Sequence, residues 1–251
     1  MSIVLTTEDI VVRFGVLQAV SNASIEVQSG FITGLIGPNG AGKTTLFNVI
    51  TGLQDPTQGR VTLDGVNITN KSPFRRARMG IARTFQKLEA FSSLSARENV
   101  LVAAEQRRSW DRSKFDPGQV ADEMLERVGI ADVAEFMVGT LPTGTARLVE
   151  LARALALDPK VLLLDEASSG LTEEETEEVA VLLRRLAGDG LGILLVEHDM
   201  SFVMGTCQYI YVLDFGRVIA QGTPVEVQAD PKVQAAYLGA VPGAPTEEVS
   251  V

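Results

Sequence analysis

The chain has 251 residues, of which 45% are hydrophobic and 22% are charged, and its formal net charge is −10. This length allows a sizeable core, and the frequent aliphatic runs exclude a disordered or fibrous chain. The acidic balance argues against a protein that binds nucleic acid through bulk positive charge. One cysteine, Cys207, cannot form an internal disulfide, which favours a reducing compartment.

The distribution of apolar and basic residues limits how the chain could meet a membrane. No apolar run approaches the roughly 18 residues of a membrane span, and the start lacks the basic segment of a secretory signal. We therefore expect a chain that is soluble by itself. Residues 71–114 hold 11 basic and four acidic residues, so this stretch carries +7. It is either a solvated helical face, which we favour, or a surface for anionic headgroups or an acidic partner.

The first third of the chain is predicted to be mostly strand, from β-branched or alternating patterns over 11–14, 24–27, 31–36 and 61–68. The last of these segments turns at Asp64-Gly65, which is a strong hairpin signal. The strand over 31–36 runs into a glycine-rich loop, and a helix over 43–51 is predicted to stop at Gly52. From about residue 73 to residue 155 the apolar spacing is mainly helical.

The last third of the chain alternates strands and helices. Buried strands are predicted over 161–164 and 193–196, and a capping box of Thr172 and Glu175 begins the helix between them. A hairpin is predicted around residues 214–216. This order predicts an α/β protein whose sheet core is interrupted by a helical insertion.

The segment Gly37-Pro38-Asn39-Gly40-Ala41-Gly42-Lys43-Thr44 matches the phosphate-binding pattern G-x-x-x-x-G-K-[ST], between an apolar strand and a helix. The glycines let backbone N–H groups face phosphate oxygens, and the helix N-terminus adds partial positive charge. Lys43 can reach the β- and γ-phosphates, and the Thr44 hydroxyl can coordinate Mg²⁺. We therefore expect a nucleotide with β- and γ-phosphates to bind here together with Mg²⁺. The expected nucleotide-binding residues in this loop and helix are Asn39, Gly40, Ala41, Gly42, Lys43, Thr44 and Thr45.

Acidic residues follow the buried strand over 161–164, where a phosphate-binding loop needs them. Asp165 would act on Mg²⁺ directly or through water, and Glu166 is placed to polarise a water for attack on the γ-phosphate. A solvated loop carboxylate is the alternative for Glu166. His198 is the only histidine, and it follows a strand that we expect beside the Asp165 strand. A γ-phosphate sensor is therefore favoured over a structural histidine.

These motifs together resemble the ATP-binding subunits of ABC transporters, over the chain up to about Gly239. The resemblance implies a P-loop NTPase of the ABC ATPase type. Its expected parts are a mixed sheet core, an N-terminal antiparallel β part and a helical subdomain over about 88–158, within one domain over 1–240. We expect residues 241–251 to form a disordered tail.

The same resemblance assigns roles to two further residues. Gln86, in Arg83-Thr84-Phe85-Gln86, would contact Mg²⁺ or the attacking water and report to the membrane subunit. Phe14 stands where the family keeps an aromatic residue that stacks on adenine, and a strand core residue is the alternative. Residues 168–172 occupy the position of the D-loop, the segment that follows the catalytic glutamate.

Three segments resemble the branched-chain amino acid uptake subgroup more narrowly: residues 77–86, Glu197-His198-Asp199-Met200 and Ala236-Tyr237-Leu238-Gly239. Such systems import hydrophobic amino acids, and relatives take urea or short amides. The implied partners are transmembrane permease subunits, a second ATP-binding subunit and, indirectly, an extracytoplasmic solute-binding protein. The implied location is the cytoplasmic face of the inner membrane, as a peripheral subunit, and no nucleic-acid partner is expected.

The sequence departs from the family pattern at the signature, usually Leu-Ser-Gly-Gly-Gln, which aligns with residues 141–145. Pro142 replaces the serine that hydrogen-bonds the γ-phosphate across the dimer, and proline has no hydrogen-bond donor. Either Thr143 or Thr145 substitutes as the donor, or this half-site is weak. Ala167 also replaces the proline that usually follows the catalytic glutamate.

Two other functional classes compete with the transporter subunit. A P-loop kinase leaves Asp165-Glu166, Gln86 and the helical insertion unexplained. A soluble ABC-type ATPase acting on DNA or ribosomes typically has two ATPase units or added domains, whereas this sequence has one phosphate-binding loop and a net negative charge. The transporter subunit is therefore the favoured prediction.

Overall fold

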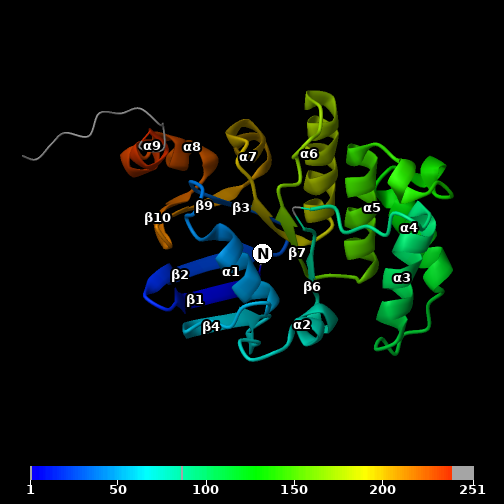
Figure 1. Cartoon of the computed structure of the whole chain (residues 1–251), viewed down its shortest axis with the longest axis horizontal. Coiled ribbons are helices and arrows are strands. Elements are labelled where there is room, and N and C mark those ends of the chain that lie inside the picture. The colour runs from blue at the N-terminus through cyan, green and yellow to red at the C-terminus, as the bar shows by residue number, and fades with distance from the viewer. Residues whose placement is uncertain (1, 86, 239–251) are drawn as a thin grey trace, which may run out of the picture.

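The computed structural model describes residues 2–85 and 87–238 (Figure 1). It contains two β-sheets, and a group of helices extends to one side of the larger sheet. The tail predicted over 241–251 and the predicted contact residue Gln86 lie outside the described residues. Across the described part of the chain, no helix is long and apolar enough to cross a membrane.

The smaller sheet is antiparallel, with the strand order β2-β1-β4-β5. Its strands are β1 (Ile3–Phe14), β2 (Leu17–Gln28), β4 (Gln58–Leu63) and β5 (Val66–Asn67). The predicted hairpin is confirmed, because Leu63 pairs with Val66 across a turn in which Asp64 and Gly65 have φ angles of 48° and 73°. Two residues with positive φ give the twist of a tight hairpin turn. The implied N-terminal antiparallel part is therefore present.

The larger sheet has the order β10-β9-β3-β8-β7-β6 and is mixed, as expected. Its strands are β3 (Ile32–Ile36), β6 (Ile81–Arg83), β7 (Val161–Asp165), β8 (Gly192–Val196), β9 (Tyr209–Asp214) and β10 (Arg217–Gly222). Strand β10 is antiparallel to β9, and the other five are parallel. The prediction missed β6, because a strand of three residues is too short to show a period. Pairing with β7 fixes it instead.

The larger sheet is buried on both faces because its central strands send alternate side chains to two cores. In β7, Leu162 and Leu164 pack into one core with the helices of the insertion, whereas Val161 and Leu163 pack into the other with the smaller sheet. Every residue of β3, β7 and β8 is buried. Burying one such leucine contributes about 1.5–3 kcal/mol. The carboxyl ends of the parallel strands are thereby held at one edge.

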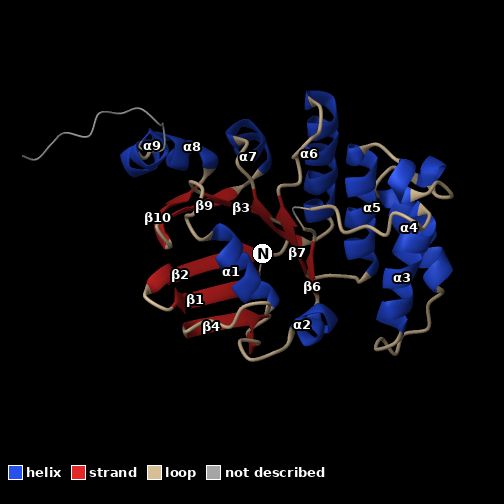
Figure 2. Cartoon of the chain, in the orientation of Figure 1, coloured by secondary structure: helices blue, strands red, loops and turns tan. Residues whose placement is uncertain are grey.

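The described residues form nine α-helices (Figure 2): α1 (Lys43–Thr51), α2 (Pro73–Met79), α3 (Ala96–Arg108), α4 (Pro117–Arg127), α5 (Thr143–Ala156), α6 (Glu173–Gly188), α7 (Met200–Thr206), α8 (Pro224–Ala229) and α9 (Pro231–Leu238). Helix α1 has the predicted bounds, and Gly52 ends it with a φ of 80°. The predicted capping box is also present, since Thr172 and Glu175 each accept the other's backbone N–H. Helices α3, α4 and α5 pack on one another beside the larger sheet and form the helical part.

Candidate active site

The loop between β3 and α1 depends on glycine for its shape. Gly37 and Gly42 have φ angles of 150° and 103°. A Cβ atom on Gly37 would lie 1.9 Å from the Leu213 carbonyl oxygen, and one on Gly42 would lie 2.5 Å from that of Ala19. Any side chain at these two positions would therefore collide with backbone of β9 or β2. The loop is therefore pressed against two strands, and only glycine fits at these two positions.

Lys43 begins helix α1, and its ammonium group stays close to the loop. Its Nζ donates hydrogen bonds to the carbonyl oxygens of Gly37, at 2.6 Å, and Pro38, at 2.9 Å. Burial lowers the pKa of Lys43, and the Glu166 and Asp165 carboxylates oppose that shift. The two predicted acidic residues therefore lie close enough to the loop lysine to interact with it electrostatically.

The strand order explains why these groups meet. Strand β8 lies between β3 and β7, with Val196 paired to Leu35 on one side and to Asp165 on the other. The prediction that the His198 strand neighbours the Asp165 strand is confirmed. Because all three strands are parallel, the phosphate-binding loop, Asp165 and His198 all follow strand ends at one edge.

Asp165 is bound by an arginine to which the sequence motifs assigned no role. Arg83, at the end of β6, donates from one Nη to Asp165 Oδ2 at 2.8 Å and from the other to Asn48 Oδ1 on α1 at 2.7 Å. Both ion-pair side chains are only 8% exposed. The guanidinium also lies over the rings of Phe47 and Phe85. Arg83 thus connects the Asp165 carboxylate to the helix of the phosphate-binding loop.

Glu166 occupies a backbone position that is unusual for a residue with a side chain. Its φ is 54°, and its backbone N–H donates to the Val196 carbonyl oxygen at 2.9 Å. Its carboxylate Oε1 lies 4.0 Å from His198 Nδ1, and the two side chains are 25% and 66% exposed, respectively. The predicted base and the predicted sensor are therefore neighbours that water and a phosphate group can reach.

A second arginine missed by sequence reasoning supports the helix of the phosphate-binding loop. Arg76 is buried on α2 and donates to the carbonyl oxygens of Val49 and Ile50 in the last turn of α1, and to that of Thr69. Cations stabilise helix C-termini, where carbonyl groups lack partners. Part of the basic stretch over 71–114 is therefore internal, and the favoured prediction of a solvated helical face is wrong for Arg76.

The remaining predicted site residues are placed as follows. Thr44 and Thr45 lie in the first turn of α1, with Thr44 exposed, and Asn39 and Gly40 are exposed in the loop. Phe14 is 49% exposed at the end of β1, so the alternative of a core residue is wrong. Its contact with adenine stays a prediction, as does the role of Gln86, which lies outside the described residues.

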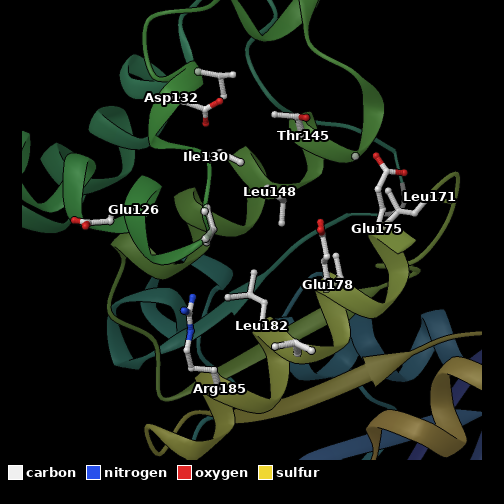
Figure 3. A pocket seen from close by; sticks show the side chains of 16 residues that line it. Glu126, Ile130, Asp132, Thr145, Leu148, Leu171, Glu175, Glu178, Leu182 and Arg185 are labelled. Atoms are coloured by element: carbon white, nitrogen blue, oxygen red, sulfur yellow. The ribbon is translucent and has the colours of Figure 1, made fainter. Parts of the chain in front are cut away.

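The signature segment lies at the start of α5. Pro142 is the N-cap of this helix, and Pro142 and Thr143 are exposed while Gly144 is buried. A cavity of about 520 Å³ opens beside this turn, between α5 and α6. Figure 3 shows Thr145 on the α5 side of this cavity, with Glu175 on the opposite side. The exposed start of α5 is therefore free to meet another molecule.

Helix α9 also reaches the phosphate-binding loop. Burial raises the pKa of Tyr237 to about 12, although a hydrogen bond between its hydroxyl and the Gly37 backbone opposes this rise. The Tyr237 side chain packs against the core that also contains β3 residues Ile32 and Ile36. Tyr237, which belongs to one of the segments that resemble the uptake subgroup in sequence, is thus in contact with the phosphate-binding loop.

Comparisons with known proteins agree with this geometry. Residues 20–169 match the family model described as ABC transporter, and residues 217–241 match the one described as Branched-chain amino acid ATP-binding cassette transporter. The high-affinity branched-chain amino acid transport ATP-binding protein BraF of Pseudomonas aeruginosa is 36% identical, across 94% of this chain and 98% of BraF. The corresponding protein LivG of Escherichia coli K12 is 38% identical, across 94% and 97%.

A solved structure gives the same result for the fold. The ADP conformation of MJ1267, an ATP-binding cassette of an ABC transporter, superposes with a TM-score of 0.86 at 32% sequence identity. The match covers 95% of this chain and 100% of the MJ1267 chain. The mixed sheet, the antiparallel part and the helical part are those of an ABC ATPase. The chain therefore belongs to the ATP-binding, ATP-hydrolysing proteins of ABC transporters, in the branched-chain amino acid transporter subgroup.

Proposed function

We propose that this ABC ATPase energises the import of branched-chain or other hydrophobic amino acids through a membrane permease. The observation that carries the proposal is the match of residues 217–241 to the branched-chain amino acid cassette family. This segment lies outside the general ABC match over 20–169, so it adds information about the subgroup. Similarity to BraF and LivG over almost the whole chain supports the same assignment.

Nucleotide binding begins at the phosphate-binding loop. Its backbone N–H groups and the N-terminus of α1 bind the phosphate oxygens, and Lys43 moves its donors from the loop carbonyls to the β- and γ-phosphates. Phe14, exposed at the end of β1, stacks on the adenine ring. These contacts orient the γ-phosphate toward the ends of β7 and β8.

The donor set fits Mg²⁺. Hydroxyl and carboxylate oxygens are its preferred ligands, and protein sites commonly complete its shell with substrate phosphates. Thr44, Asp165 and Gln86 would hold the ion, with Arg83 bound to Oδ2 of the aspartate. When bound, Mg²⁺ supplies neutralisation of the charge that develops on the phosphate oxygens.

Hydrolysis depends on Glu166 and His198, which follow the ends of β7 and β8. Glu166 accepts a proton from a water molecule whose oxygen attacks the γ-phosphorus, and the bond to the β-phosphate oxygen breaks to give ADP and phosphate. His198, with Nδ1 4.0 Å from the Glu166 carboxylate, hydrogen-bonds the γ-phosphate and reports its presence. Because Glu166 is only partly buried, its carboxylate is held in one orientation toward the γ-phosphate while water can still reach it.

A second ATP-binding subunit completes the working unit. The exposed turn with Pro142 and Thr143 meets the nucleotide held by the other subunit, and ATP closes the pair because it binds the closed state better. Closure and reopening move the permease subunits, to which the solute-binding protein delivers the amino acid. The chain works at the cytoplasmic face of the inner membrane and needs no nucleic acid.

Uptake by cells that lack the chain tests the proposed solute. We expect deletion to lower the uptake of radiolabelled leucine, isoleucine and valine by about tenfold or more, with urea uptake unchanged. The wild-type chain should restore uptake and a Glu166→Gln chain should not. Loss of urea or amide uptake with normal leucine uptake would move the assignment to the urea and amide importers, and unchanged uptake of all these solutes would refute it.

A further inference from the structure

One buried carboxyl group has no role in the mechanism above. Glu197 follows β8 directly, between the strand and His198, and its side chain is 0% exposed. A buried carboxyl group destabilises a fold unless hydrogen bonds satisfy it. Its Oε1 accepts bonds from the Ser168 backbone N–H, at 2.7 Å, and from the Ser168 hydroxyl, at 2.9 Å. Its Oε2 accepts from the His198 backbone N–H at 3.2 Å.

These bonds hold the turn that carries the catalytic carboxylate. Glu166 has a φ of 54°, a conformation that is unfavourable for a residue with a side chain and persists only where its surroundings fix it. One restraint is the bond from the Glu166 N–H to the Val196 carbonyl oxygen. The next residue, Ala167, does not fix its own φ as proline would. The Ser169 N–H also donates to the Glu166 carbonyl oxygen, at 3.2 Å, and Ser168 bound to Glu197 is a further restraint on this turn.

The same side chain also borders the histidine. His198 Nδ1 lies 3.8 Å from Glu197 Oε2 and 4.0 Å from Glu166 Oε1. Glu197 thus touches both of the loops that leave β7 and β8 at the catalytic edge. A displacement of one loop relative to the other would have to break or stretch its hydrogen bonds.

We propose that Glu197 is a positioning residue for ATP hydrolysis. Its carboxyl group fastens Ser168 to the end of β8, which keeps the strained Glu166 backbone in place and its carboxylate beside His198. This inference rests on the proposed base role of Glu166. The active property is the capacity of Oε1 to accept two hydrogen bonds from Ser168, which a glutamine side chain keeps and an alanine side chain loses. The glutamine NH₂ group cannot accept the His198 N–H as Oε2 does, so this variant loses only that longer bond of 3.2 Å.

Steady-state ATPase assays on the full chain test the proposal, with KM and kcat measured separately. We expect Glu197→Ala to lower kcat by about tenfold to a hundredfold, the range for a misplaced catalytic group, while KM and the Kd for a fluorescent ATP analogue stay within about twofold. Glu197→Gln should keep about half of kcat or more. Ser168→Ala should lower kcat by about twofold to fivefold, because only the hydroxyl bond is lost.

The controls separate this proposal from the function on which it rests. If Glu166→Gln turns over ATP like the wild type, the base assignment fails. If Glu166→Gln is inactive but Glu197→Ala has wild-type kcat, the positioning role alone fails. An inactive Glu197→Gln variant with normal thermal stability would also overturn it. Should Glu197→Ala not fold, Ser168→Ala decides, and an unchanged kcat with that variant contradicts the proposal.

Discussion

At the residue scale, buried charged side chains hold the site together: Arg83 binds the Asp165 carboxylate, and Glu197 binds the backbone and hydroxyl of Ser168. Lys43 was predictable because it lies in the phosphate-binding pattern, and Asp165 was predictable because it directly follows a buried strand. The buried position of Arg83 was not predictable, because a charged residue is expected on the surface unless a buried partner for it is known. Its partner Asp165 lies far away in the sequence and becomes its neighbour only through the pairing of β6 with β7. Glu197 and Ser168 are likewise distant in the sequence and become neighbours only through the pairing of β7 with β8.

Glu150 allows a prediction about pH. Burial raises the pKa of Glu150 on α5, outweighing the hydrogen bond from the Glu89 N–H and the charges of Arg153 and Arg147. The charged form therefore destabilises the folded state at high pH, and this effect disappears as the pH falls toward the unfolded value of 4.5. Glu150→Gln keeps an acceptor oxygen and removes the charge, so it should raise the melting temperature.

Circular dichroism melts of both proteins between about pH 8 and pH 5 measure this difference. We expect the Glu150→Gln variant to have the higher melting temperature at the alkaline end, with the difference shrinking toward the acidic end. A variant that melts below the wild type at the alkaline end, or whose advantage grows with acidification, would contradict the assigned cause of the pKa shift.

At the element scale, helix α1 was predictable to the residue and β6 was not predictable at all. Lys43 follows the glycine-rich loop and Gly52 ends the helix with a positive φ, so both limits have local signals. Strand β6 spans only Ile81–Arg83 and exists through its pairing with β7. Helix α1 was found from its local end signals, whereas β6, which a distant partner fixes, required the structure.

The start of α5 carries the element-scale prediction. Pro142 is the N-cap and has no side-chain oxygen to bind the free N–H groups of the first turn. Pro142→Ser supplies a cap worth about 1 kcal/mol and a hydroxyl donor for the nucleotide of the second subunit. We expect a higher melting temperature and a higher ATPase rate. A stabilised variant with an unchanged rate would mean that Thr143 or Thr145 already supplies the donor.

At the scale of the whole molecule, the net charge of −10 describes the chain as an average and hides the basic stretch over 71–114. The +7 stretch over 71–114 is divided: Arg76 and Arg83 are buried against α1 and Asp165, while Arg75 and Arg78 are exposed. The α/β class and the family were predictable because the phosphate-binding loop, two buried strands and the helical spacing each have strong sequence patterns. How the basic stretch is divided between interior and surface required the packing of α2 and β6.

The central claim is that ATP is bound at the phosphate-binding loop and hydrolysed through Glu166. The most direct test compares the wild type, Glu166→Gln and Lys43→Ala in one preparation, with ATP affinity measured by calorimetry and turnover by phosphate release. We predict that Glu166→Gln binds ATP within about twofold of the wild type but loses about a thousandfold or more in turnover, while Lys43→Ala loses binding itself. Turnover by Glu166→Gln at the wild-type rate would contradict the account.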